Sequence, residues 1–114
     1  ESSAHENFKQ AILNTKEGET QLTLKELTPV RLIKNKFFED IQELYNQCAT
    51  KEDLAKLLGK ARAKKGIFEG DLIEGELEIG QVSGLIHEIK SAASIVSELI
   101  KEYELAKASV AQFL

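Results

Sequence analysis

The stretch Glu69–Ile86 reads EGDLIEGELEIGQVSGLI, and the interpretation of the whole fold depends on it. It sets Gly70, Gly75, Gly80 and Gly84 among acidic and aliphatic residues. The order of its acids does not fit an EF-hand calcium loop, so a solvated acidic edge is the simpler interpretation. Neither common glycine-rich phosphate-binding motif is present. The spacing instead indicates backbone that passes close to a neighbour or needs a positive φ angle.

Two of these glycines could also serve a ligand. Gly80 and Gly84 are four residues apart, so on a helix they would present one smooth face. Close packing of that face against another element is the simpler interpretation. The functional alternative is a glycine surface that lines a ligand pocket.

The composition limits the class of protein. The chain has 114 residues, enough for one small domain. Its net charge of −4 gives no electrostatic reason to bind nucleic acid or an anionic membrane. No apolar run approaches the roughly 20 residues that a transmembrane helix needs. The single cysteine, Cys48, indicates a reducing, cytoplasmic location. Because the chain lacks methionine and opens on Glu1, we expect a processed chain or a fragment of a longer protein.

The N-terminal part predicts one helix followed by two short strands. Ser3 and Glu6 form a capping-box pattern, and glycine ends the predicted helix near Gly18. Alternating residues predict a strand over 20–24, and Val30–Ile33 after the proline predicts a second one. We expect the apolar face of the helix to pack on barrel strands, and that face comprises Ala4, Phe8, Ala11 and Ile12.

The remainder of the chain predicts helices. One begins at Asn35 and places Cys48 on its buried face, and another is capped by Thr50 and ends near Gly66. A short helix is expected around residues 82–89. Ser91 caps a longer helix with a predicted buried stripe, namely Ile95, Val96, Leu99, Ile100, Tyr103 and Val110. The predicted fold class is therefore mainly α with a small β element.

The sequence shows no complete catalytic or metal site. His5 and His87 have no cysteine or second histidine at metal-ligand spacing, so each is interpreted as a surface histidine. Cys48 lacks a basic neighbourhood and is interpreted as a buried small apolar residue. We therefore expect no catalytic residue and no metal ligand in this chain.

Three motifs occur in a fixed order along the chain. Their residues are Glu1, His5 and Lys9, then Val30, Arg31, Lys34 and Asn35, then Glu69, Gly70, Asp71, Gly80, Gln81, Gly84 and Leu85. In this order they resemble the C-terminal third of the flavin enzymes called nitronate monooxygenases, formerly 2-nitropropane dioxygenases. The related flavin-type enoyl-acyl-carrier-protein reductases show a similar pattern.

The resemblance implies a fold and a cofactor. The parent would be a (β/α)8 TIM barrel that holds FMN, with a helical domain on the substrate side. Residues 1–18 would be a late outer helix of the barrel, 19–78 a small, mostly helical domain, and 79–114 the closing helices. The phosphate-binding glycines and the catalytic histidine of the family would lie upstream. FMN would then bind only the complete parent, and this chain alone would be an inactive fragment of the oxidoreductase.

The resemblance also implies which residues face the ligand. Gly80 and Gln81 would line the flavin pocket, and Glu78 and Ile79 would lie on the substrate side. Because Glu78 is acidic, a pocket for a long acyl chain is disfavoured. We therefore expect oxidation of alkyl nitronates by a monooxygenase, and a fragment of an enoyl-acyl-carrier-protein reductase is the alternative. The implied partners are the rest of the barrel, or a second copy through self-association, and a small-molecule substrate. The alternative, which needs no resemblance, is an independent helical protein-interaction module.

Overall fold

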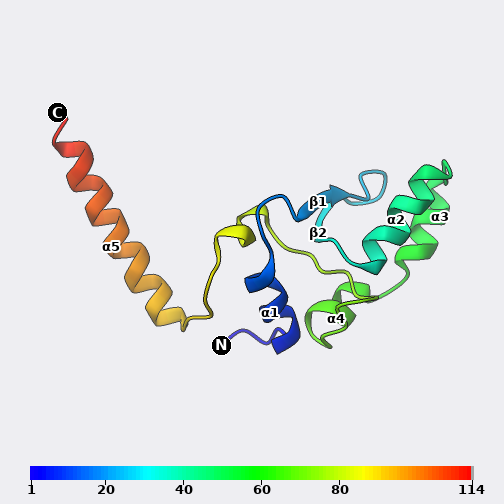
Figure 1. Cartoon of the computed structure of the whole chain (residues 1–114), viewed down its shortest axis with the longest axis horizontal. Coiled ribbons are helices and arrows are strands. Elements are labelled where there is room, and N and C mark those ends of the chain that lie inside the picture. The colour runs from blue at the N-terminus through cyan, green and yellow to red at the C-terminus, as the bar shows by residue number, and fades with distance from the viewer. Residues whose placement is uncertain (114) are drawn as a thin grey trace.

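The computed structural model describes residues 1–113 as seven regular elements and one 3₁₀ helix (Figure 1). Their order confirms a mainly α chain with a small β element. The elements are α1 (Glu6–Asn14), β1 (Thr20–Thr23), β2 (Val30–Ile33), α2 (Lys36–Asn46), α3 (Lys51–Leu58), α4 (Arg62–Ile67), the 3₁₀ helix η1 (Gln81–Leu85) and α5 (Ala92–Ala111).

The two predicted strands form an antiparallel hairpin, with Thr20 opposite Ile33. A third segment, which the sequence did not predict, runs along the free edge of β2. The amide of Ile33 donates to the carbonyl of Leu77, and the amide of Ile79 donates to the carbonyl of Arg31, each at 3.0 Å. This pairing fixes the course of the chain directly before Gly80 and η1.

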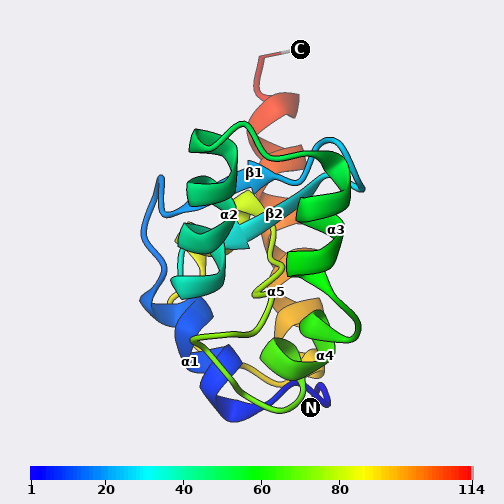
Figure 2. The same ribbon diagram turned by 90° about the vertical axis from the view of Figure 1, so that its right-hand side faces the viewer.

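The core lies between the hairpin and the helices α2 and α3, which lie side by side (Figure 2). The N-cap of α2 is Asn35, whose side chain accepts a hydrogen bond from the amide of Phe38. Its amide group also donates to the carbonyls of Leu72 and Gly75, which ties the glycine-spaced stretch to the core. The buried cluster comprises Leu24, Leu32, Phe37, Phe38, Ile41 and Leu54.

Helix α1 differs from its prediction at both ends. The N-cap is His5 rather than Ser3, because the Nδ1 atom of His5 accepts a hydrogen bond from the amide of Asn7 at 3.1 Å. The helix ends at Asn14 instead of near Gly18, since the next residue takes an extended conformation. Gly18 lies in the turn that follows, with a φ angle of +81°.

The single helix predicted to run to Gly66 is in fact two helices. Gly59 has a φ angle of +62°, which ends α3. The guanidinium group of Arg62 then donates to the carbonyls of Leu57 and Leu58, at 2.8 and 3.0 Å. These bonds satisfy acceptors that a helix end leaves open, so the break is stable without further helix.

The segment between α2 and α3 gives one confirmed and one wrong prediction. Thr50 caps α3 as expected, in a reciprocal capping box with Asp53. Cys48, however, is exposed, because it lies beyond the end of α2 with a φ angle of +53° and not on the buried face of the helix.

The two terminal helices differ in how far this chain buries them. On the predicted apolar face of α1, Phe8 is only 5 % exposed, whereas Ala4, Ala11 and Ile12 are half-buried. Helix α5, predicted to bury a stripe, has every one of its residues exposed and extends away from the other elements (Figure 1). Among the described residues, no helix is both long enough and apolar enough to cross a bilayer.

Candidate functional site

The predicted pocket residues lie where the chain leaves the sheet edge and enters η1. Gly80 is the N-cap of η1, with extended backbone at φ −73° and ψ 157°. The amide of Ser83 donates to the carbonyl of Gly80 at 3.1 Å, which closes the first turn. Ser83 is fully buried and anchors η1, and its Oγ atom has no hydrogen-bond partner among the described residues.

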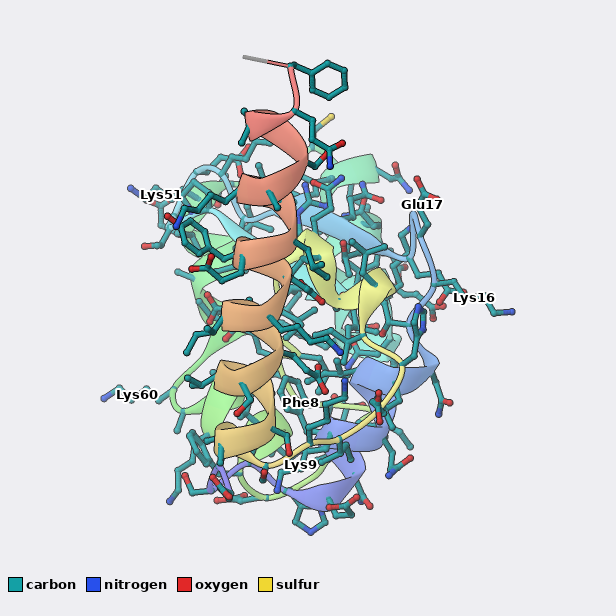
Figure 3. The ribbon with its side chains drawn as sticks, turned by 90° about the vertical axis from the view of Figure 1, so that its left-hand side faces the viewer. Phe8, Lys9, Lys16, Glu17, Lys51 and Lys60 are labelled. Carbon is teal, nitrogen blue, oxygen red and sulfur yellow. The ribbon has the colours of Figure 1, made fainter. Side chains whose placement is uncertain are left out.

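The two glycines of this segment have different surroundings. A Cβ atom added to Gly84 would lie 3.1 Å from the amide nitrogen of Glu17 and 3.3 Å from the carbonyl carbon of Lys16. Gly84 is therefore packed closely against the loop after α1, which carries Lys16 and Glu17 in Figure 3, and a side chain there would push that backbone back by a few tenths of an ångström. A Cβ at Gly80 would meet only a methyl group of Val82, at an ordinary 3.9 Å. Packing within the described chain therefore does not require glycine at position 80.

An open hollow of about 380 Å³ lies on η1. Its lining is mainly apolar, because Val82 and Leu85 are 62 % and 75 % exposed. Gln81 is also exposed and adds an amide that can both donate and accept hydrogen bonds. The remaining lining residues are Glu17 and Gly84. Such a surface can contact a flat, largely apolar group and make a polar contact at its rim.

The predicted substrate-side pair does not line this hollow. Glu78 is exposed at the sheet edge, opposite Leu32 of β2. Ile79 is half-buried and makes its backbone bond to Arg31. Both residues directly precede Gly80, so they lie beside the hollow along the chain without facing it.

Sequence reasoning did not name all of the lining residues as site residues. Gln81 was predicted, and Leu85 belongs to the same motif. Val82 was assigned only to a short predicted helix, and it is exposed. Glu17 comes from the loop after α1, and no sequence signal places that loop against η1.

The earlier glycines of the opening stretch confirm close backbone approach. A Cβ at Gly75 would overlap the backbone of Gly66 and the carbonyl of Asp71. A Cβ at Gly66 would lie 2.8 Å from the carbonyl oxygen of Glu76. The two glycines therefore face each other where α4 meets the following turn, and their role is structural.

The acidic residues of the stretch form a turn. The Oδ1 atom of Asp71 accepts hydrogen bonds from the amides of Glu74 and Ile73, at 2.8 and 3.0 Å. The Glu74 amide, followed by the ion pair with Lys65, lowers the pKa of Asp71 below its usual value. Across residues 1–113, no three His, Cys, Asp or Glu side chains converge as a metal site would require.

Neither histidine lies at the hollow. The imidazole of His5 packs over Gly70, which has a φ angle of +76°, and caps α1 as described above. His87 is exposed in the segment between η1 and α5.

Comparisons with known proteins agree with this arrangement. The family model "Nitronate monooxygenase" matches residues 1–102. The solved structure of FabK from Thermotoga maritima is 26% identical and superposes with a TM-score of 0.85 over 97% of this chain and 35% of FabK. A mutant of FabK from the same organism is also 26% identical, with a TM-score of 0.79 over 99% of this chain and 33% of that chain. The chain thus spans about a third of these proteins. No curated protein matches the sequence.

Proposed function

Because this chain belongs to the nitronate monooxygenase family of flavin-dependent oxidoreductases, we propose that it is the C-terminal part of an FMN-dependent enzyme that oxidises alkyl nitronates. Residues 1–18 would then be an outer helix of the barrel, 19–78 the small helical domain, and 79–114 the closing helices. The match covers only about a third of FabK. This coverage supports the proposal that most of the barrel comes from other residues of the enzyme.

The observation that carries the proposal is the contrast between Gly84 and Gly80. Packing within this chain explains the first glycine and leaves the second unexplained. A flat ring system placed against the backbone at Gly80 would explain it, because any side chain there would hold the ring away. Gln81 follows on the open hollow, where its amide can bond to a polar edge of such a ring or of a substrate.

The described residues fit one edge of an FMN site and not the whole site. Gly80 and Gln81 would contact the cofactor, whose ring system, when bound, accepts the electrons of the oxidation. The exposed side chains of Val82 and Leu85 would exclude water from that edge. Neither common glycine-rich phosphate-binding motif occurs in the sequence. The phosphate would therefore be held by the rest of the enzyme.

Reduction of an enoyl thioester by the same cofactor is the second candidate activity. The superposition with FabK over nearly the whole chain favours it, together with the resemblance of the motifs to the reductase branch. On sequence grounds alone, the acidic Glu78 directly before Ile79 and Gly80 disfavours a long acyl chain, but the exposed Glu78 does not line the hollow and does not decide between the two activities. Assays of the complete protein with an alkyl nitronate, and with an enoyl thioester plus a nicotinamide donor, separate the two.

Substitution of Gln81 tests the site itself. In the complete flavoprotein, Gln81→Ala should change FMN affinity or substrate kinetics while the melting temperature hardly moves. Gly84→Ala is the matched control, because it crowds the Lys16–Glu17 backbone and should lower the melting temperature. If Gln81→Ala changes only the melting temperature, the segment is a packing feature and the site assignment fails.

The chain alone offers a second test. When it is purified and mixed with FMN, we expect no tight flavin complex in the visible spectrum and no turnover of either substrate. Stoichiometric FMN binding with turnover would show that 114 residues suffice, and the fragment proposal would be wrong.

A further inference from the structure

Among the described residues that line the hollow on η1, Glu17 is the charged one, and the proposed function leaves it without a role. The other lining residues are Gln81, Val82, Gly84 and Leu85, so the carboxylate lies beside an otherwise uncharged surface. Glu17 is exposed and comes from the loop after α1, on the opposite side of the hollow from the η1 residues. The hollow therefore combines an apolar lining with one negative charge.

The loop that carries Glu17 is held in place by backbone contacts. The amide of Lys16 donates to the Oε2 atom of Glu19 at 2.6 Å, and the amide of Glu19 donates to the carbonyl of Lys16 at 3.2 Å. From the other side, Gly84 of η1 packs against the backbone of Lys16 and Glu17 (Figure 3). These contacts fix where Glu17 leaves the backbone and leave its carboxylate free to act on a ligand.

The charge of Glu17 is not neutralised inside the hollow. The Nζ atom of Lys34 donates to the carbonyl of Gly18 at 3.4 Å, so a cation contacts the same loop, but Lys34 does not line the hollow. Within residues 1–113, Glu17 forms no ion pair. A second negative charge that enters the hollow would therefore be repelled by Glu17 without a cation between the two.

We propose that Glu17 determines substrate specificity, because it makes the hollow accept nitronates with an uncharged alkyl chain and disfavours those whose chain ends in a carboxylate. This inference rests on the proposed function, since it takes the hollow as part of the flavin and substrate site. The exposed side chains of Val82 and Leu85 contact the alkyl chain, and the amide of Gln81 donates a hydrogen bond to the nitronate oxygens. A carboxylate at the far end of the chain then lies near Glu17, and the two like charges repel each other.

Titration calorimetry of the complete protein with two matched ligands tests this role. The ligands are a short alkyl nitronate and a nitronate of the same chain length that ends in a carboxylate, so the charge of the nitronate group cancels in the ratio of their dissociation constants. The flavin is kept reduced without oxygen, so that the bound nitronate is not oxidised. In Glu17→Gln, the ratio should move at least about fivefold toward the carboxylated ligand, as expected for two charges a few ångströms apart near water. The preference of the unchanged protein for the uncharged chain should weaken at about 1 M salt, where charges are screened within about 3 Å.

Glu19→Gln is the matched control, because it removes the same charge from the same loop and does not line the hollow. Its side-chain oxygen can still accept from the amide of Lys16, as the carboxylate does now. A ratio that stays unchanged in Glu17→Gln, or that changes as much in Glu19→Gln, overturns the proposal, and so does a failure of both ligands to bind.

Turnover reports on the proposed function separately. The oxidised, unchanged protein is assayed with the uncharged alkyl nitronate. If the two ligands bind with the expected change of ratio but neither is oxidised, the proposed function fails and the role of Glu17 in ligand selection stands. If the uncharged nitronate is oxidised but the ratio ignores Glu17, the proposed function stands and the role of Glu17 fails.

Discussion

Leu54 of α3 and Leu99 of α5 belong to apolar stripes of the same kind, yet Leu54 is 1% exposed and Leu99 is 60% exposed. Leu54 packs into the cluster formed with β2 and α2, whereas nothing in the described chain covers Leu99. The comparison teaches that an apolar periodicity specifies that a face will be covered, but not by what. The body of the chain buries its own apolar stripes, whereas the described chain leaves the stripe of α5 exposed.

The largest expected effect comes from the centre of the body. Phe37→Ala should lower the free energy of unfolding by about 3–5 kcal/mol, because the ring is fully buried and its loss leaves a cavity. Leu99→Ala, the matched change on α5, should leave the stability of the isolated chain unchanged. Urea denaturation followed by circular dichroism measures both. If Phe37→Ala and Leu99→Ala lowered the free energy of unfolding equally, the contrast between the body and α5 would be wrong, because α5 would then be packed in the isolated chain.

The second effect concerns the contact between two glycines in the body. Gly75→Ala should cost about 2–3 kcal/mol, because the new methyl group meets the backbone of Gly66, which cannot move aside as a side chain can. Gly80→Ala should cost far less in the isolated chain, since only a Val82 methyl group lies nearby. Thermal unfolding of both variants tests this. A large loss for Gly80→Ala would show that position 80 is structural.

Much of the body could be predicted because its signals are local. The N-cap at Thr50 and the alternation that predicts β1 depend on residues adjacent in sequence, and both predictions are confirmed. The break between α3 and α4 was missed because it depends on Arg62, whose guanidinium group turns back to the carbonyls of Leu57 and Leu58. A basic residue near a helix end indicates only a favourable dipole, not a new helix start.

The remaining predictions were wrong or incomplete where the packing partner of a segment lies far away in the sequence or is not part of the described chain. Residues 77–79 pair with β2, which lies some 45 positions earlier in the sequence. A segment this short has no alternating pattern long enough to indicate which residues of β2 it pairs with. Gln81 lines the hollow, and its role at a flavin stays a prediction, whereas the Glu17 side of the hollow depends on a loop that no pattern positions. The buried stripe predicted for α5 is wrong for the described chain, in which no element covers that face.

A third prediction concerns the hydrogen bonds of Arg62. Its guanidinium group also donates to the carbonyl of Glu74 at 2.8 Å and lies over the ring of Phe37, 4.4 Å from the centroid. Arg62→Lys keeps the charge but loses the planar fork, so it should cost about 1–2 kcal/mol. Lys107→Ala on α5, where the pair with Glu104 is exposed, should have no measurable effect in the isolated chain. Chemical denaturation measures the free energy of unfolding of both variants. If Arg62→Lys leaves it unchanged, the hydrogen bonds of the guanidinium group do not contribute to stability.

The smallest effect is a pH dependence that also separates body from α5. Glu76 is only 8 % exposed, and burial, followed by the charge of Glu78, raises its pKa above the usual value, while Arg62 opposes the shift. Because the raised pKa belongs to the folded state, this carboxyl group favours folding below its unfolded pKa of about 4.5 and loses that contribution as the pH rises through the folded pKa.

Glu76→Gln should therefore stabilise the chain slightly at pH 7, where it removes a partly buried charge, and should have little effect at about pH 3, well below the unfolded pKa, where both side chains are neutral. Glu102→Gln on the exposed α5 should leave the free energy of unfolding unchanged at both pH values. Denaturant titrations at the two pH values measure this difference. If Glu76→Gln destabilises the chain at pH 7, the ionised carboxylate is held by attraction to Arg62 rather than strained by burial. The attraction to Arg62 would then affect the pKa of Glu76 more than burial does.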